Sequence, residues 1–156
     1  MTESASLDTR RYPDRPFAGV GAVIVEDGKV VLIRRRFEPL KGQWSLPGGA
    51  VELGETLVSS VAREMLEETG LHVDVGPVIE VFDRITRDED GRVRYHYVLV
   101  DYLCWPRGGE LRAGSDVDAA VLVDPVNLAD YRLTAKATSV IERALELHRT
   151  ASRSIR

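Results

Sequence analysis

Residues 49–71 read GAVELGETLVSSVAREMLEETGL and decide the fold of this chain. Five residues separate Gly49 from Glu55, and seven more separate Glu55 from the segment REMLEETGL, which starts at Arg63. We predict that one helix carries the glutamates of this segment and that Gly70 ends the helix, because glycine readily adopts the left-handed backbone of a helix end. Fixed spacing of glycines and carboxylates around one helix indicates a site for metal and phosphate.

The predicted helix places Glu64, Glu67 and Glu68 within about 100° of arc, since each residue turns the helix by roughly 100°. An adjoining apolar stripe is expected to face the core and consists of Leu57, Val58, Val61, Ala62, Met65 and Leu66. Carboxylates beside a buried edge repel one another more strongly as water is excluded. A bound cation would remove that repulsion. Oxygen ligands favour a hard divalent ion, so we predict Mg²⁺, with Mn²⁺ as the alternative.

Two other parts of the pattern are expected to support this site. Glu55 is predicted in the first helical turn, where negative charge complements the helix dipole, and within reach of an ion pair with Arg63. That pair would brace the loop against the helix. Pro47-Gly48-Gly49 is predicted to form a close turn with exposed backbone groups, so the carbonyl of Gly48 could supply a further metal ligand.

A solvated helix face is the competing interpretation of a glutamate-rich helix end. An isolated acidic run would favour it. Here the long spaced pattern, with its two glycines and internal arginine, favours the metal site instead.

At these residues the chain resembles the Nudix hydrolases, whose box is G-x5-E-x7-R-E-U-x-E-E-x-G-U, with U an aliphatic residue. Every fixed position is filled. The resemblance extends upstream to Arg34-Arg35 and to residues 44–49, WSLPGG, and in outline covers residues 17–148. It implies an α/β fold, a sandwich of helices on both sides of a mixed sheet.

The resemblance also implies roles for the box residues. Glu64, Glu67 and Glu68 would be metal ligands, one of them also the base that activates water, and Glu55 with Arg63 would form a structural salt bridge. The implied reaction is metal-dependent cleavage of a nucleoside diphosphate linked to another moiety.

Within that class we prefer ADP-ribose or another NDP-sugar as substrate. One alternative is a nucleoside triphosphate cleaved to monophosphate and pyrophosphate. Another is a module that senses nucleotides without hydrolysing them, which usually lacks one or more box carboxylates, whereas this chain keeps all of them. The proline that ADP-ribose-specific members tend to carry downstream of the box is replaced by Thr86-Arg87, so no subtype signature matches.

Substrate-binding residues are less specifically marked. Arg34 and Arg35 are the preferred phosphate ligands, because arginine forms paired hydrogen bonds to phosphate. Further candidates, each of which could equally be a surface or packing residue, are Arg36, Arg84, Arg87, Arg92 and Arg94 for phosphate and Trp44, Phe82, Tyr95 and Tyr97 for a base or ribose. Asp116 and Asp118 are candidates for the extra acidic residue that the resembled family often adds, and His96 is expected to be structural.

Composition agrees with a small enzyme. A chain of 156 residues fits one domain. The net charge of −4 argues against broad nucleic-acid binding. No apolar run is long enough to cross a membrane and no signal peptide is apparent, so a cytoplasmic location is expected. Cys104 is the single cysteine and is expected in the core. The oligomeric state stays open, with a homodimer as one option.

The domain is expected to span residues 17–150, between a flexible arm at 1–16 and a tail at 151–156. Strands are predicted at residues 18–26, 30–35, 71–84, 92–105 and 119–123, with a hairpin at Asp27-Gly28, a turn after Asp124-Pro125 and a closing helix around residues 137–145.

Overall fold

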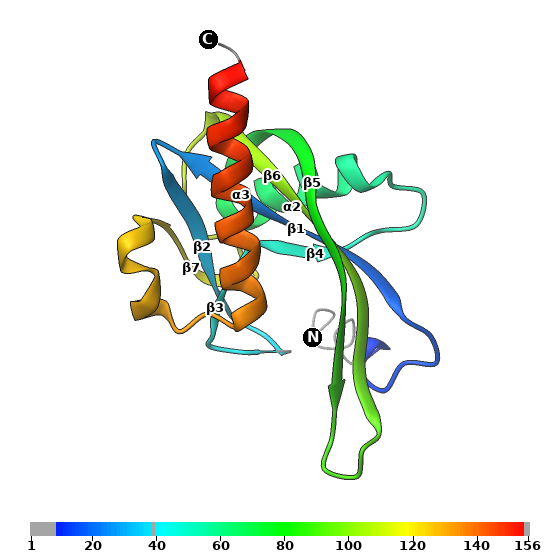
Figure 1. Ribbon diagram of the computed structural model, residues 1–156. Helices are drawn as coiled ribbons and strands as arrows, with labels where there is room; N and C mark the ends of the chain where they lie inside the picture. The colour runs from blue at the N-terminus through cyan, green and yellow to red at the C-terminus, as the bar shows by residue number, and fades with distance from the viewer. Residues whose placement is uncertain (1–8, 39, 155–156) are drawn as a thin grey trace.

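The computed structural model describes residues 9–38 and 40–154 (Figure 1). The described residues form the helices α2 (Leu57–Thr69) and α3 (Ala135–Ser154), the 3-10 helix η1 (Pro125–Tyr131), and the strands β1 (Phe17–Glu26), β2 (Lys29–Arg35), β3 (Trp44–Ser45), β4 (Gly48–Ala50), β5 (Leu71–Arg87), β6 (Val93–Gly109) and β7 (Val117–Val123). No helix among them combines the length and apolar character needed to span a bilayer.

Strand β1 lies at the centre of a mixed sheet. It pairs antiparallel with β2 and β4 and parallel with β6. Strand β5 pairs with the far edge of β6, while β3 and β7 both pair with β2. The path across the sheet is β3-β2-β1-β6-β5.

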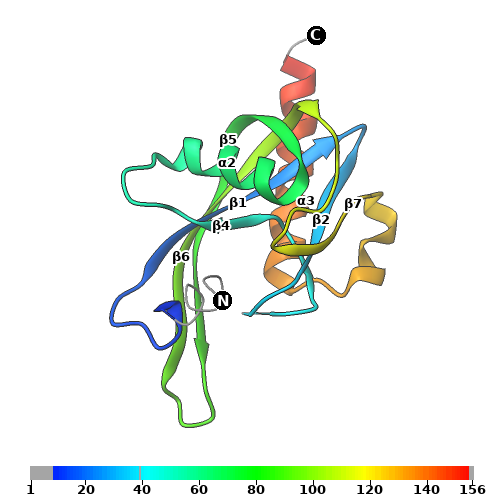
Figure 2. The same cartoon turned by 180° about the vertical axis from the view of Figure 1, so that it is seen from behind.

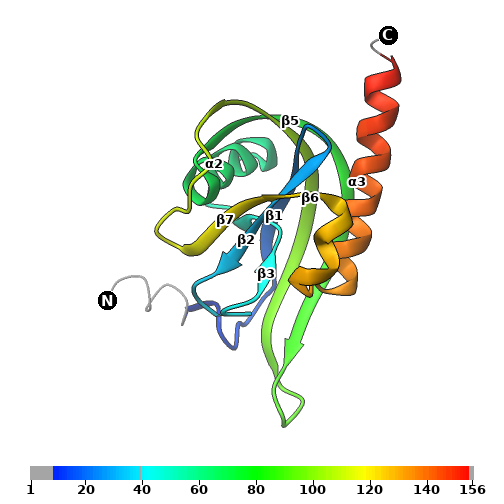
Figure 3. The same ribbon diagram turned by 90° about the vertical axis from the view of Figure 1, so that its left-hand side faces the viewer.

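The two long helices cover opposite sides of this sheet, which Figure 3 shows from the edge and Figure 2 from the α2 side. Successive side chains of a strand point to opposite faces, so β1 contributes to two cores. Val20, Ala22 and Ile24 pack with Val61 and Met65 of α2. The opposite face packs against α3 in a cluster that includes Val23, Val25, Val140, Ile141 and Ala144. The predicted α/β/α sandwich is confirmed.

The start of helix α2 differs from its prediction, whereas its end does not. Its N-cap is Thr56, whose side chain accepts a hydrogen bond from the Ser59 N–H, so Glu55 precedes the helix and does not lie in its first turn. The first turn holds no acidic residue. Gly70 ends the helix with φ 75°, as predicted.

The predicted apolar stripe of α2 is only partly correct. Val61 and Met65 are buried, but Leu57, Val58 and Leu66 are exposed. The helix is rotated so that Ser60, Glu68 and Thr69 also face inward. Two of these inward polar groups are hydrogen-bonded, because the Thr69 hydroxyl donates to the Met65 carbonyl and Glu68 accepts from the backbone of β4. The buried Ser60 hydroxyl has no hydrogen-bond partner among the described residues.

Several boundaries also differ. Gly48–Ala50 is a short strand paired with β1, not a turn with free backbone groups. Strands β5 and β6 are longer than predicted and form a hairpin that extends well beyond the sandwich (Figure 1). Helix α3 includes residues 151–154, which were assigned to a tail.

Residues 1–8 of the predicted N-terminal arm lie outside the described residues. Within the described remainder of that arm, the Tyr12 hydroxyl donates to Asp88 at 2.8 Å and the Arg92 guanidinium lies over the Tyr12 ring. This part of the arm therefore contacts the tip of the hairpin.

Candidate metal and nucleotide site

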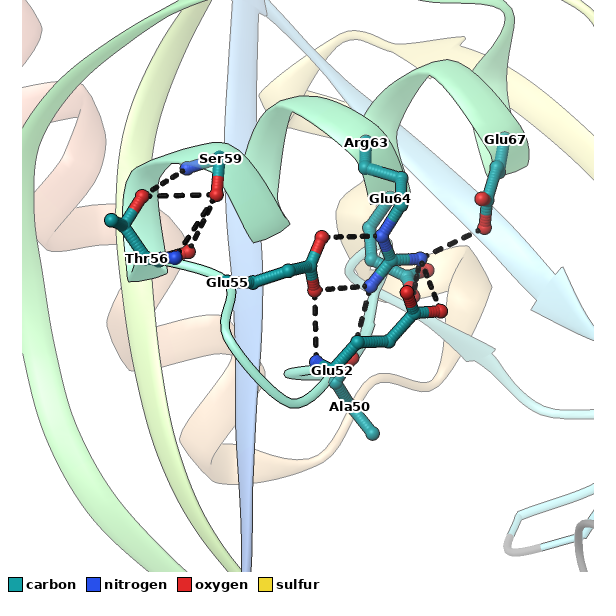
Figure 4. A network of polar contacts seen from close by, with 8 residues as sticks. All are labelled: Ala50, Glu52, Glu55, Thr56, Ser59, Arg63, Glu64 and Glu67. Carbon is teal, nitrogen blue, oxygen red and sulfur yellow. Dashed lines mark hydrogen bonds and ion pairs between the residues drawn. The ribbon is translucent and has the colours of Figure 1, made fainter.

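Arg63 is the centre of an ion-pair network on the first turns of α2 (Figure 4). Its Nε and Nη2 atoms donate to the two Glu55 oxygens at 2.7 and 2.9 Å. Nη2 also donates to the Ala50 carbonyl at 3.1 Å. The guanidinium thus connects the helix, the loop before it and strand β4. The expected Glu55–Arg63 salt bridge is present, in the bidentate geometry that makes such pairs strong.

The same arginine reaches two of the predicted metal ligands, which the sequence did not indicate. Nη1 of Arg63 donates to Glu64 at 2.9 Å and to Glu67 at 3.2 Å. Glu52, from the loop, lies 3.6 Å from the same nitrogen. Arg63 is therefore shared among four carboxylates.

The charge on Arg63 determines how Glu55 titrates. Hydrogen bonds from Arg63, with a further one from the Glu52 N–H, lower the pKa of Glu55 to about 2. Glu55 consequently stays ionised at any physiological pH. Its carboxylate therefore holds Arg63 as an anion and is poorly suited to transferring protons.

Glu64 lies against the backbone of β4. A side-chain Cβ placed on Gly49 would clash with the Glu64 carboxylate, so only glycine leaves room for this carboxylate. Burial raises the pKa of Glu64, and the nearby negative charges of Glu67 and Asp116 act in the same direction, while Arg63 opposes them.

Glu68 is the most deeply buried carboxylate of the helix, with 7% of the residue exposed. Its Oε1 accepts a hydrogen bond from the Gly48 N–H at 2.6 Å. Burial nevertheless raises the pKa of Glu68 to about 8, and Glu64 and Asp116 add to the shift. A buried carboxylate with a pKa this high lacks a sufficient counter-charge.

These observations test whether a divalent cation fits. No three carboxylate, histidine or cysteine side chains among residues 9–38 and 40–154 converge into a ready-made metal site. However, Glu64, Glu67, Glu68 and Asp116 line one cavity together with Gly48. All these groups offer oxygen, and two of the carboxylates have pKa values raised by burial. The residues therefore fit a hard cation that brings water to complete its shell.

The structure distinguishes the two later aspartates. Asp116 lines the cavity that Glu64, Glu67 and Glu68 share, which we call the carboxylate cavity. The charge of Asp116 raises the pKa values of Glu64 and Glu68. Asp118 instead forms an ion pair with Arg36 at 3.0 Å and does not line this cavity. Asp116 is thus the aspartate that can join the site.

The two preferred arginines point to different places because neighbouring residues of a strand face opposite sides. Arg35 lines the carboxylate cavity and lowers the pKa of Glu68. Arg34 stacks over the Trp44 ring at 5.5 Å and lines neither this cavity nor its neighbour. Of the two, Arg35 is the one that lines a cavity where a phosphate could bind, and substrate binding by either arginine stays a prediction.

A second cavity adjoins the first across β4, and both share Arg35 and the Gly48–Ala50 backbone in their walls. Trp44, Phe82 and Tyr97, three of the four aromatic candidates, line this second cavity. We call it the aromatic cavity. A phosphate bound in one cavity could therefore carry a base or sugar in the other.

The lining of the aromatic cavity also includes the charged residues Arg84, Asp101 and Lys136. The sequence indicates Arg84 as a candidate phosphate ligand, whereas Asp101 and Lys136 are not among its candidates. Asp101 carried a readable signal, because it is a lone charge within the otherwise apolar run VLVDYLC. Lys136 had no such signal, since a lysine near the start of a helix is usually solvated.

Other candidates lie away from both cavities. Tyr95, His96, Arg87, Arg92 and Arg94 line neither of them. Cys104 is buried in the core beside α2, as expected, and burial raises the pKa of its thiol to about 12.

Comparison with known proteins agrees with this geometry. The NUDIX domain model matches residues 15–144. This chain belongs to the NUDIX domain family.

Individual NUDIX relatives extend the comparison. An "ADP-ribose pyrophosphatase" of Methanocaldococcus jannaschii is 41% identical over 113 residues, which cover 72% of this chain but only 64% of the archaeal protein. A "MutT-like protein" of Streptomyces ambofaciens is 36% identical over 122 residues, covering 78% of this chain and 72% of the relative. The crystal structure of a MutT NUDIX hydrolase from Burkholderia pseudomallei superposes with a TM-score of 0.70 at 31% identity, covering 83% of this chain and 98% of that one.

Proposed function

We propose that this NUDIX protein is a divalent-metal-dependent pyrophosphohydrolase that cleaves the diphosphate linkage of a nucleoside diphosphate derivative, such as ADP-ribose or another NDP-sugar. The observation that carries the proposal is the arrangement of Glu64 and Glu68. Both carboxylates are held against the backbone of β4, which is also the wall of the aromatic cavity. A diphosphate bound beside them would have room for an attached nucleoside.

Glu64, Glu67, Glu68 and Asp116 would hold the cation, with the Gly48 carbonyl as a further oxygen donor. When bound, Mg²⁺ or Mn²⁺ would neutralise charge on the phosphate oxygens and on the leaving phosphate. Arg35 would bind phosphate from the opposite wall, since it lines both cavities.

Glu64 is the better candidate for the base that activates water. Burial raises the pKa of both Glu64 and Glu68, so the pKa values do not separate the two candidates and their hydrogen bonds decide. Glu68 is less suited because its Oε1 already accepts the Gly48 N–H. Arg63 and Glu55 would position Glu64 without touching substrate.

One relative supports a nucleoside diphosphate derivative over a triphosphate. The archaeal protein of 41% identity is named for ADP-ribose. The aromatic cavity is compatible with this preference, because its lining suits a base or a sugar. A nucleoside triphosphate cleaved to monophosphate and pyrophosphate is the second candidate, because the carboxylates and Arg35 of the same cavity would accept either phosphate chain.

A panel of nucleotides tests the proposal. ADP-ribose, other NDP-sugars and nucleoside triphosphates would be incubated with Mg²⁺ or Mn²⁺, and their products separated by chromatography. We expect AMP and ribose phosphate from ADP-ribose, and loss of that reaction in Glu64→Gln. Glu142→Gln, an exposed glutamate on α3, is the matched control that should retain activity. Release of pyrophosphate from triphosphates alone would favour the second candidate, and binding without any hydrolysis would indicate a sensor.

A further inference from the structure

Asp101 on β6 is a buried carboxylate outside the metal site, with 5% of the residue exposed. Among the described residues, none donates a hydrogen bond to its carboxylate and none forms an ion pair with it within 4.0 Å. An ionised carboxylate only accepts hydrogen bonds, and because Asp101 lines the aromatic cavity its oxygens can accept them from a molecule bound there. Such a group in a binding cavity is expected to obtain its donors from a ligand.

The carboxylate is directed into the aromatic cavity. Asp101 and Gly21 both line that cavity and are register partners in the parallel β1–β6 pair. A Cβ on Gly21 would lie 2.5 Å from Asp101 Oδ1. The absent side chain at position 21 thus leaves the space that the Asp101 carboxylate occupies.

The sheet register fixes where Asp101 lies relative to the metal site. Gly21 pairs with Gly48 on one side and with Asp101 on the other. Neighbouring strands are about 4.8 Å apart, so the backbones of Gly48 and Asp101 are separated by roughly 10 Å. A diphosphate beside Gly48 would therefore place the sugar attached to it, more closely than the base, over Asp101.

Cationic groups lie near Asp101 without forming an ion pair with its carboxylate. Arg84 of β5 and Lys136 of α3 lower the pKa of its carboxyl, while Glu80 of β5 and, to a greater degree, burial raise it to about 6. Lys136 is itself engaged in an ion pair with Glu80. The two cations therefore lie near Asp101 without donating a hydrogen bond to its carboxylate, which leaves both oxygens available to a bound molecule.

We propose that Asp101 accepts hydrogen bonds from the 2′- and 3′-hydroxyls of the nucleoside ribose, so that the site selects ribonucleotides over deoxyribonucleotides. The proposal rests on the proposed function, because it needs the diphosphate to lie beside Gly48. Adjacent hydroxyls supply two donors on one side of the sugar, which matches the two oxygens of a carboxylate. An acidic residue serves ribose hydroxyls in the same way in dinucleotide-binding folds.

Calorimetric titration with α,β-methylene-ADP and its 2′-deoxy and 3′-deoxy forms, all with Mg²⁺, tests this selection. The wild type should bind the ribose form about tenfold or more tightly, as expected for loss of a hydrogen bond to a charged, buried acceptor. Asp101→Asn should reduce that preference to about twofold while weakening the ribose form. Gly21→Ala should do the same without changing the charge, because it displaces the carboxylate.

Asp83→Asn is the matched control, since Asp83 is exposed on the same hairpin and lines neither cavity. It should retain the wild-type preference. Circular dichroism melting would establish that each variant folds, and Asp101→Asn is expected to keep its fold even if Gly21→Ala does not, because it replaces a buried charge with an amide of the same shape.

The outcomes separate the two proposals. Equal affinity of the wild type for the ribose and deoxyribose forms, or an unchanged preference in Asp101→Asn, overturns the role of Asp101 even if ADP-ribose is hydrolysed. A preference that depends on Asp101 in a protein that hydrolyses no nucleotide overturns the hydrolase and supports the ribose contact. A protein that binds none of the three analogues contradicts both.

Discussion

The Gly48 N–H donates to Glu68 Oε1 across 2.6 Å and joins two residues that are 20 positions apart in the sequence. The contact fixes the second half of α2 on strand β4, beside Gly49, whose missing side chain makes room for Glu64. One backbone hydrogen bond does not replace the hydration that Glu68 loses, and its pKa remains raised to about 8. In the metal-free protein, the burial of the ionised Glu68 carboxylate is therefore unfavourable.

This burial predicts how stability depends on pH without metal. Glu68 titrates near 4.5 when unfolded but near 8 when folded. Between these values the folded protein holds more protons than the unfolded chain, so the free energy of unfolding should fall as pH rises through this window and level off above it. Urea unfolding at several pH values in EDTA would measure the slope. Glu68→Gln should flatten it, and an unchanged slope in that variant would contradict the assigned burial.

Arg63 should matter more for stability than the ligand carboxylates do. Arg63→Ala leaves Glu55 and Glu64 without their shared partner, whereas Glu64→Gln removes one of several crowded negative charges. We expect Arg63→Ala to lower the melting temperature in EDTA by roughly 5 °C or more, and Glu64→Gln to change it little or raise it. Differential scanning calorimetry would rank the two. A larger loss for Glu64→Gln would show that Arg63 is not the brace.

The site-bearing helix was predictable because its residues act through short-range spacing. The glycine that ends α2, the Glu55–Arg63 pair and the carboxylates on one helix all follow from intervals within one segment. The rotation of the helix did not follow, because apolar periodicity alone favours burying Leu57, Val58 and Leu66. The structure instead buries Glu68, whose partner is on a strand that the sequence presented as a turn.

Contacts between distant segments account for the other differences. Arg34 and Arg35 are adjacent arginines that the sequence does not distinguish. Only the pairing of β2 decides which of them reaches the cavities. Asp101 and Gly21 become neighbours through a parallel pairing of β1 with β6 that no local pattern specifies. The choice between Asp116 and Asp118 as the additional acidic residue depends on the ion pair of Asp118 with Arg36, which only the structure shows.

Gly49→Ala should disable the site through sterics alone. The added methyl would clash with the carboxylate carbon and both oxygens of Glu64. We expect turnover to fall by roughly a hundredfold, as for a small displacement of a catalytic group, with a smaller effect on nucleotide affinity. Gly108→Ala, at the end of β6 where a Cβ would meet nothing within 4 Å and the backbone is not left-handed, reports the cost of losing a glycine far from the site. Equal activity in both variants would remove Glu64 from the proposed machinery.

Metal and nucleotide should bind with strong mutual dependence. Arg63 holds Glu64 and Glu67 in the free protein, and the described residues contain no preformed three-ligand site, so Mg²⁺ alone should bind weakly. A diphosphate would add oxygens that complete the shell, and the coupling must then be reciprocal. Calorimetric titration of Mg²⁺, with and without α,β-methylene-ADP, should show at least about tenfold tighter binding when the analogue is present. Arg35→Ala should reduce this coupling by weakening the binding of the analogue's phosphates, whereas Arg34→Ala should leave the coupling intact. Equal Mg²⁺ affinities with and without the analogue would mean that the cation does not bridge the carboxylates and the phosphates, and the proposed hydrolysis would lose its physical basis.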